Sequence, residues 1–216
     1  DFYSAHVFFK DLNKIKYLAI GDFTACFGQG LVMGSGFGFG KNQYVMKIDR
    51  QGQSLRHYSS VNEIDFLRGI GASVTFGKFT LTPVFSYKRL DANVVEKDLE
   101  SGGPVVVSSL IKTGFHRTYS ELEDKNSIDQ TVAGGNISYR KMNLHLGLSL
   151  ITLKLGAVLS KQDELYNKFE PKTDRFTNAG LDYFYIIKNF HFFGEAAKSV
   201  KGGTAILNGV IISLDR

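Results

Sequence analysis

Along most of this chain, large apolar residues alternate with small or polar ones, so that every second side chain belongs to the same chemical class. In the segment 79–88, one side carries Phe79, Leu81, Pro83, Phe85 and Tyr87. The other side carries Thr80, Thr82, Val84, Ser86 and Lys88. The same alternation recurs in 130–140, 144–150, 178–187 and 66–76, where the residues expected on the large apolar face are Phe66, Ile70, Ala72, Val74 and Phe76. Because successive side chains of a β-strand point to opposite faces, this period of two predicts an all-β fold.

The residues between the large apolar ones are mostly Gly, Ser, Thr and Asn, with few charges. A soluble β-sandwich carries many polar and charged residues on its outer faces, whereas a transmembrane β-barrel turns its apolar face to lipid. Aromatic residues near the expected strand ends, typical of the girdles of such barrels, are Phe76, Phe79, Tyr87, Tyr139 and Phe190. A soluble barrel whose large residues face inwards is the alternative.

The connections between the expected strands alternate between short and long. The short ones lie at 11–14, 77–78, 141–142 and 188–189, and the long ones near 24–63, 93–129 and 156–175. Outer-membrane barrels combine tight periplasmic turns with long outside loops, while loops in compact soluble domains usually span roughly 2–6 residues. The loop lengths therefore favour an antiparallel up-and-down transmembrane β-barrel.

The same division of the chain predicts nine strands. They are expected at 4–10, 15–23, 64–76, 79–91, 130–140, 143–154, 176–187, 190–198 and 204–214. Single-chain bacterial barrels have an even number of strands. We therefore expect residues 1–216 to form a single segment, of about nine or ten strands, of a larger outer-membrane barrel.

The sequence carries no recognisable catalytic, cofactor or metal motif. The Gly-rich stretch 28–41 fails as a phosphate-binding loop, because Ser35 and Asn42 stand where Gly and Ser or Thr are required. The five histidines lack the paired spacing of zinc ligands, and Cys26 is the only cysteine. The acidic stretch 121–126 lacks the glycine and final glutamate of a calcium loop. We expect no enzymatic activity, no cofactor and no metal site.

Charged residues give two further expectations. A cluster of basic residues within the first long loop consists of Lys47, Arg50, Arg56 and His57. Such a cluster suits lipopolysaccharide, a small solute or a polyanion, and it is also typical of a solvated loop surface. The formal charge of +5 is too small to indicate nucleic acid. The charged residues expected on the polar strand faces, which predict a mixed-charge lumen without ion selectivity, are Lys88, Arg140, Asp65, Asp182 and Glu195.

Seven strings spread over the chain carry a likeness to a known family. They are LAIGDF at 18–23, FGQGL at 27–31, FGK at 39–41, LRHYSSVNE at 55–63, FLRG at 66–69, SSLIKTGFHRT at 108–118 and FGEAA at 193–197. They resemble segments of Bacteroidota envelope proteins described as helix-hairpin-helix domain-containing, in which a β-barrel follows that small domain. The resemblance implies an outer-membrane barrel portion. The helix-hairpin-helix part is not among these residues, so no DNA contact is implied for this segment.

We therefore expect an outer-membrane β-barrel segment that acts as a pore, a transporter component or an envelope scaffold. It would lie in the bacterial outer membrane, in contact with lipid and lipopolysaccharide. The alternative is a soluble β-barrel that binds a small apolar ligand. The direction of six side chains separates the two, because lipid requires them to point outwards and a soluble binder inwards: Phe79, Leu81, Phe85, Leu144, Leu146 and Leu148.

Overall fold

The computed structural model describes residues 3–34, 48–50, 53–60, 64–97, 103–111, 113–114, 116–161, 164–167 and 170–214. The elements in chain order are β1 (His6–Leu12), β2 (Ile15–Ala25), β3 (Leu55–His57), β4 (Leu67–Phe76), β5 (Phe79–Leu90), β6 (Ala92–Lys97), β7 (Pro104–Leu110), α1 (Tyr119–Glu123), β8 (Ile128–Lys141), β9 (Leu144–Leu159), η2 (Leu165–Asn167), β10 (Thr173–Ile187), β11 (Phe190–Ser199) and β12 (Thr204–Ile212).

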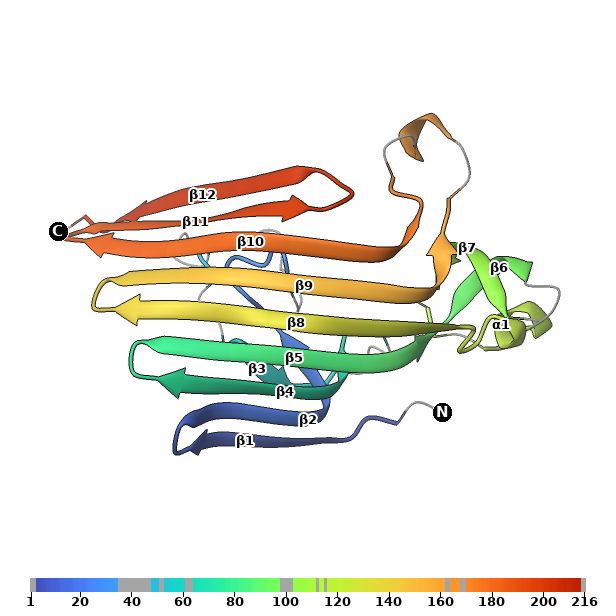
Figure 1. The fold of residues 1–216 in the computed structure, drawn as a ribbon, viewed down its shortest axis with the longest axis horizontal. Helices are drawn as coiled ribbons and strands as arrows, with labels where there is room; N and C mark the ends of the chain where they lie inside the picture. The colour runs from blue at the N-terminus through green and yellow to red at the C-terminus, as the bar shows by residue number, and fades with distance from the viewer. Residues whose placement is uncertain are drawn as a thin grey trace.

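All twelve described strands belong to one sheet, and nine of them form a continuous path in the order β1-β2-β4-β5-β8-β9-β10-β11-β12 (Figure 1). Every neighbouring pair along this path is antiparallel. The predicted all-β, antiparallel up-and-down arrangement is therefore confirmed. Four tight turns, centred at 13–14, 77–78, 142–143 and 188–189, lie at one end of the sheet, which we call the short-turn end (left in Figure 1).

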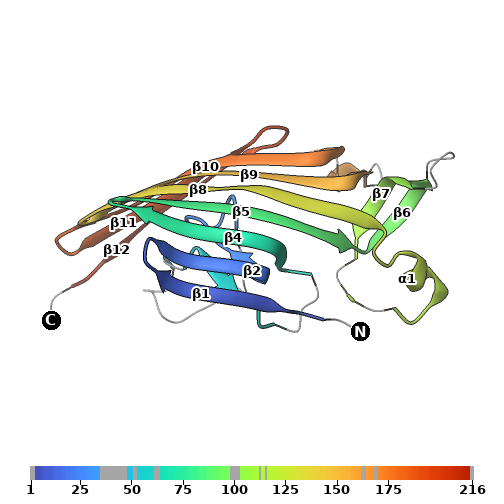
Figure 2. The same ribbon diagram turned by 60° about the horizontal axis from the view of Figure 1, so that its bottom comes forward.

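The sheet is arched and open rather than closed on itself (Figure 2). Within the described residues, β1 pairs only with β2, and β12 pairs only with β11. Because neighbouring strands along a nine-strand path alternate in direction, β1 and β12 run the same way. Two strand edges therefore keep unpaired backbone donors and acceptors.

Several elements inside the long connections were not predicted. The first of these connections contains β3, which pairs with the end of β2. The second contains the β6–β7 hairpin, whose β7 also pairs with β9 in parallel at Val106 and Val107. The same connection contains α1, which begins with a capping box: Thr118 is the N-cap, and the Glu121 carboxylate accepts the backbone N–H of Thr118. Hydrogen bonds from the backbone N–H groups of Arg117 and Thr118 lower the pKa of Glu121.

The two faces of the sheet differ in side-chain chemistry as the alternation predicts. On the face that we call outer, large apolar residues such as Ile70, Phe85 and Leu148 are exposed. On the opposite, inner face, residues such as Thr82 and Ser149 are buried. The predicted face of Phe66 is wrong. This ring precedes β4, is buried, and packs on the ring of Tyr58, with the centroids 4.9 Å apart.

Buried apolar side chains form two separate clusters. The larger lies on the inner face, towards the middle of the sheet, and contains Phe23, Phe27, Leu55, Val84 and Ile151 among others. The smaller lies where the β6–β7 hairpin meets the far ends of β8 and β9, and contains Leu90, Ala92, Val107, Ile128, Leu155 and Ala157. Each long connection that covers the sheet thus brings apolar side chains of its own.

Gly21 in β2 allows β1 to approach closely. Its φ is +93°, and a Cβ atom there would lie 2.3 Å from the backbone oxygen of Ala5. We expect Gly21→Ala to lower the free energy of unfolding by about 1–3 kcal/mol, because both the backbone angle and the contact become strained. Denaturant unfolding would measure this, with Gly203→Ala as the control, because a Cβ at Gly203 meets no atom within 4 Å. Equal unfolding midpoints for the two variants would contradict the prediction.

Candidate functional site on the inner face of the sheet

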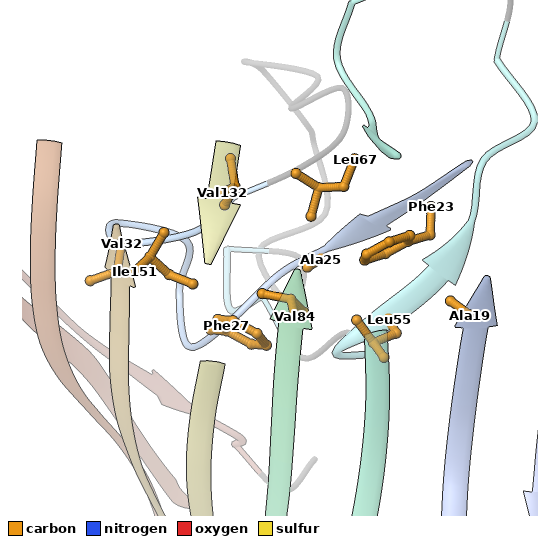
Figure 3. Close-up of a cluster of buried hydrophobic side chains, with 10 residues drawn as sticks. All are labelled: Ala19, Phe23, Ala25, Phe27, Val32, Leu55, Leu67, Val84, Val132 and Ile151. Atoms are coloured by element: carbon orange, nitrogen blue, oxygen red, sulfur yellow. The ribbon is translucent and has the colours of Figure 1, made fainter. Parts of the chain in front are cut away.

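The connection between β2 and β4 folds back onto the inner face of the sheet. We call its described residues, 26–34, 48–50 and 53–60, the inner-face loop. Phe27, Val32 and Leu55 of this loop belong to the same buried cluster as Val84, Val132 and Ile151 of strands β5, β8 and β9 (Figure 3). Apolar packing therefore places part of the loop against the middle of the sheet rather than in solvent.

Glu195 of β11 holds the tip of the inner-face loop. Its carboxylate accepts the backbone N–H of Leu31 at 3.1 Å and that of Val32 at 3.1 Å. The residue is only 3% exposed, so both hydrogen bonds are shielded from competing water. A charged acceptor that receives two backbone donors is a strong tie between segments far apart in the chain.

Gly28 explains how the loop comes so close to β10 and β11. Its φ is +53°, and a Cβ atom there would lie 2.8 Å from the Cβ of Asp182 and 2.9 Å from Oε2 of Glu195. Any larger residue would push the loop away from these two carboxylates. Gly28, which belongs to the Gly-rich stretch 28–41, therefore serves close packing; residues 35–41 of that stretch lie outside the described residues.

Gln29 links two arms of the inner-face loop. Its Nε2 donates to Oδ1 of Asp49 at 2.8 Å, and its Oε1 accepts the backbone N–H of Arg50 at 2.9 Å. A backbone hydrogen bond from Cys26 N to Ser54 O, 3.0 Å long, joins the start of the loop to its last part, residues 53–60. The loop is thus internally connected as well as attached to the sheet.

A cavity of about 880 Å³ lies between the inner-face loop and the short-turn end of the sheet. Its sheet side is mainly hydroxyl and amide groups, which include Ser73, Thr75, Thr80, Thr82, Asn136 and Ser138. The phenylalanine and tyrosine residues that line it are Tyr17, Phe27, Tyr183 and Phe184. The volume is in the range of pockets that hold small-molecule ligands, which is roughly 300–1,000 Å³.

Four cationic side chains line this cavity: Lys16, Lys78, Arg140 and Arg50. They come from β2, the β4–β5 turn, β8 and the inner-face loop, respectively. Within the described part of the chain, none of the four forms an ion pair. Lys16 makes one contact of another kind, with its Nζ 5.5 Å from the centre of the Tyr17 ring.

The two acidic residues that line the cavity already have partners. Asp182 Oδ2 lies 3.2 Å from Nε2 of His145, and Asp49 accepts the hydrogen bond from Gln29. Another carboxylate predicted for the polar faces, Glu195, is occupied by the two loop amides. Of the cations predicted for these faces, Arg140 lines this cavity and Lys88 does not.

A second cavity, of about 530 Å³, lies towards the long-connection end. Two of the basic residues that line it, Lys88 and Arg68, are occupied by the fold. Buried Lys88 donates to the backbone oxygens of Ile64 and Phe66. Arg68 donates to both carboxylate oxygens of Asp22, through Nε at 2.7 Å and Nη2 at 2.9 Å. These cations anchor the strand ends rather than leaving charge free for a ligand.

The remaining residues singled out from the sequence do not converge. Lys47 lies outside the described residues, and Arg56 is exposed on β3. The ring of His57 stacks on that of His6, with the centroids 5.2 Å apart. The acidic stretch 121–126 includes the end of α1. No group of three or more His, Cys, Asp or Glu in the described part of the chain is placed to hold a metal ion.

Sequence reasoning did not single out Lys16, or the pairing of Glu195 with loop amides. Lys78 stood in a predicted tight turn and Arg140 on a predicted polar face, so their placement at one cavity could have been suspected from strand order. Among the described residues, none of the helices is long and apolar enough to cross a membrane.

No protein-family model, curated protein or solved structure matches this chain. The function is therefore argued from the geometry of the chain itself.

Proposed function

We propose that this chain forms part of the wall of a bacterial outer-membrane β-barrel, with the inner-face loop inside the lumen. The observation that carries the proposal is the outward direction of the apolar side chains. The exposed fraction is 54% for Phe79, 41% for Leu81, 49% for Phe85, 44% for Leu146 and 51% for Leu148. Leu144, at the start of β9, is half-buried. A lipid-facing wall needs this arrangement, because lipid replaces water against the apolar face.

The small polar residues of the inner face fit the same proposal. Thr82 donates to Ser73 at 3.0 Å, and Asn136 donates to Ser149 at 3.0 Å, both across neighbouring strands. A lumen lined by mutually bonded polar groups suits water or a polar solute. The soluble alternative, a barrel that binds an apolar ligand, would instead need the large residues on this inner face.

Exposed aromatic rings near both ends of the strands also support a membrane position. Phe76, Phe79 and Phe190 are exposed at the short-turn end, and Phe79 lies beside Tyr139 with the ring centroids 5.0 Å apart. Tyr87 is exposed towards the opposite end. Aromatic girdles at the two interfaces are a general feature of outer-membrane barrels.

The two free edges set a condition on the proposal. In lipid, every backbone donor and acceptor needs a partner, so β1 and β12 must both be paired. Since these strands run in the same direction, antiparallel closure requires an odd number of strands beyond the nine. In this arrangement the wall contacts lipid, and lipopolysaccharide would lie at the long-connection end, where the outside loops are expected.

Such a wall would serve as a pore, a transporter component or an envelope scaffold, and the inner-face loop favours a restricted passage over a wide channel. Loop residues occupy the middle of the inner face, where an open porin would hold water. Passage of a solute would then depend on the space left beside the loop.

Membrane fractionation of the protein produced from its complete gene tests this proposal. We expect recovery in the outer-membrane fraction, resistance to extraction by alkaline wash, and a gel mobility that changes on boiling. Folded barrels resist the detergent of the gel at room temperature and unfold only on heating, because the closed hydrogen-bond ladder between the strands leaves no free edge. Recovery in the soluble fraction, with the same mobility before and after boiling, would overturn it.

A further inference from the structure

We infer that the cavity beside the inner-face loop is a binding site for a small hydroxylated anion, such as a phosphorylated or carboxylated sugar. This inference rests on the proposed function, because it names the class of solute that a partly blocked lumen would hold. Its first support is the convergence of Lys16, Lys78, Arg140 and Arg50 on one cavity. These residues come from four separate segments, so the fold gathers cations that the sequence disperses.

The second support is an excess of positive over negative side chains among the described residues of the lining. The cavity is lined by four lysine and arginine residues and by two acids, Asp49 and Asp182. Both acids are held by neighbours, Asp49 by Gln29 and Asp182 by His145. The cations have no such partner among the described residues. A positive potential therefore remains in the cavity, and low-dielectric walls focus it on an entering anion.

The third support is the position of the cations relative to one another. Arg140 donates its backbone N–H to the backbone oxygen of Lys78 at 2.9 Å, so the end of β8 that carries Arg140 lies beside the β4–β5 turn that carries Lys78. Lys16 lies where the β2–β4 register shifts between Ile15 and Tyr17. Arg50 faces them from the loop side of the cavity. An anionic group between them can receive donors from two directions, and arginine offers the paired donors that phosphate and carboxylate accept.

The neutral lining points to a hydroxylated solute rather than to a bare inorganic ion. Thr75 and Thr80 have their hydroxyls 3.2 Å apart, and Ser138 and Gln53 add further donors and acceptors to the wall. Such groups exchange hydrogen bonds readily with sugar hydroxyls. The ring of Tyr17 offers an apolar surface for the carbon skeleton. The volume of about 880 Å³ exceeds what a single phosphate would fill.

Isothermal titration of the detergent-solubilised, folded protein tests the site, with glucose 6-phosphate and gluconate as the anionic probes and glucose as the neutral one. Both anions should bind, and more weakly as salt is added, whereas glucose should give no measurable heat. We expect Lys78→Gln and Arg140→Gln each to weaken anion binding about tenfold, as the loss of one charged hydrogen bond implies.

Two matched variants control for the general basic character of this end of the sheet. Lys188→Gln changes another tight-turn lysine, and Lys141→Gln changes the neighbour of Arg140 on the opposite face; neither residue lines the cavity. Both should leave binding unchanged. Absence of anion binding, or an equal loss in all four variants, would overturn the inference.

The binding measurement and the membrane fractionation can give independent answers. A protein that shows the heat-dependent mobility but binds no anion would overturn the site alone. A soluble, heat-indifferent protein that still binds glucose 6-phosphate through Lys78 and Arg140 would overturn the membrane proposal and support the site.

Discussion

Replacing Leu148 with arginine is expected to lower the stability of the membrane-inserted protein by about 2–4 kcal/mol. Leu148 is the fifth of the 16 residues of β9 and lies on the outer face, directly between Ile137 of β8 and Leu181 of β10. If this face contacts the hydrocarbon core, the guanidinium must lose water or distort the bilayer. Urea unfolding in lipid vesicles would measure the difference, and fractionation of cells would show reduced assembly.

A second leucine provides the control for this experiment. Leu165 in η2 is even more exposed, at 91%, but lies in a long connection outside the sheet. Leu165→Arg should change stability by no more than about 0.5 kcal/mol, as surface substitutions usually do. If Leu148→Arg proved equally harmless, the outer face would be in contact with water and the membrane proposal would fail.

Replacing Glu195 with alanine should release the inner-face loop from the sheet. The change removes the shared acceptor of the Leu31 and Val32 N–H groups; the hydrogen bond of Val32 is buried and that of Leu31 is partly buried. A hydrogen bond to a charged group contributes about 1.5–3 kcal/mol, so we expect a local loss of roughly 3 kcal/mol for the two together. Hydrogen exchange at these two amides should then accelerate about a hundredfold.

Two further variants separate release of the loop from general damage. Glu195→Gln keeps a neutral acceptor and should give an intermediate exchange rate. Glu96→Ala removes an exposed carboxylate from β6 and should leave the exchange of Leu31 and Val32 as it was. In a planar bilayer, Glu195→Ala should also raise the ion conductance, because the loop no longer fills the lumen. Unchanged exchange in Glu195→Ala would show that apolar packing alone holds the loop.

The nine-strand path could be predicted because its evidence is local. Alternation within a strand and a turn at its end are both written in neighbouring residues, as between Phe79 and Tyr87. Phe66 was misplaced because it continues the same alternation, yet the strand begins only at Leu67. Phe66 instead lies just before the strand, where Tyr58 covers its ring and the ammonium of Lys88 is 4.4 Å from the ring centre.

The elements of the long connections were harder to predict because their support comes from elsewhere in the chain. The strand β3 forms against the end of β2, and β7 forms against β6 and β9. The short helix was not predicted either, although Thr118 followed by Glu121 is a capping box visible in the sequence. The role of Glu195 had no such signal, because its partners are backbone amides and every residue except proline has one.

The hydrogen bonds from the loop to Glu195 can form only late in the synthesis of the chain. They join residues 164 and 163 positions apart, whereas the ladders of the sheet join strands that follow one another along its path. During synthesis from the N-terminus, Leu31 and Val32 leave the ribosome long before their acceptor exists. Until β9 arrives, Phe27 and Val32 lack part of the cluster that buries them, and until β11 arrives the loop lacks its acceptor. A chain with apolar side chains still exposed is prone to aggregate and depends on chaperones.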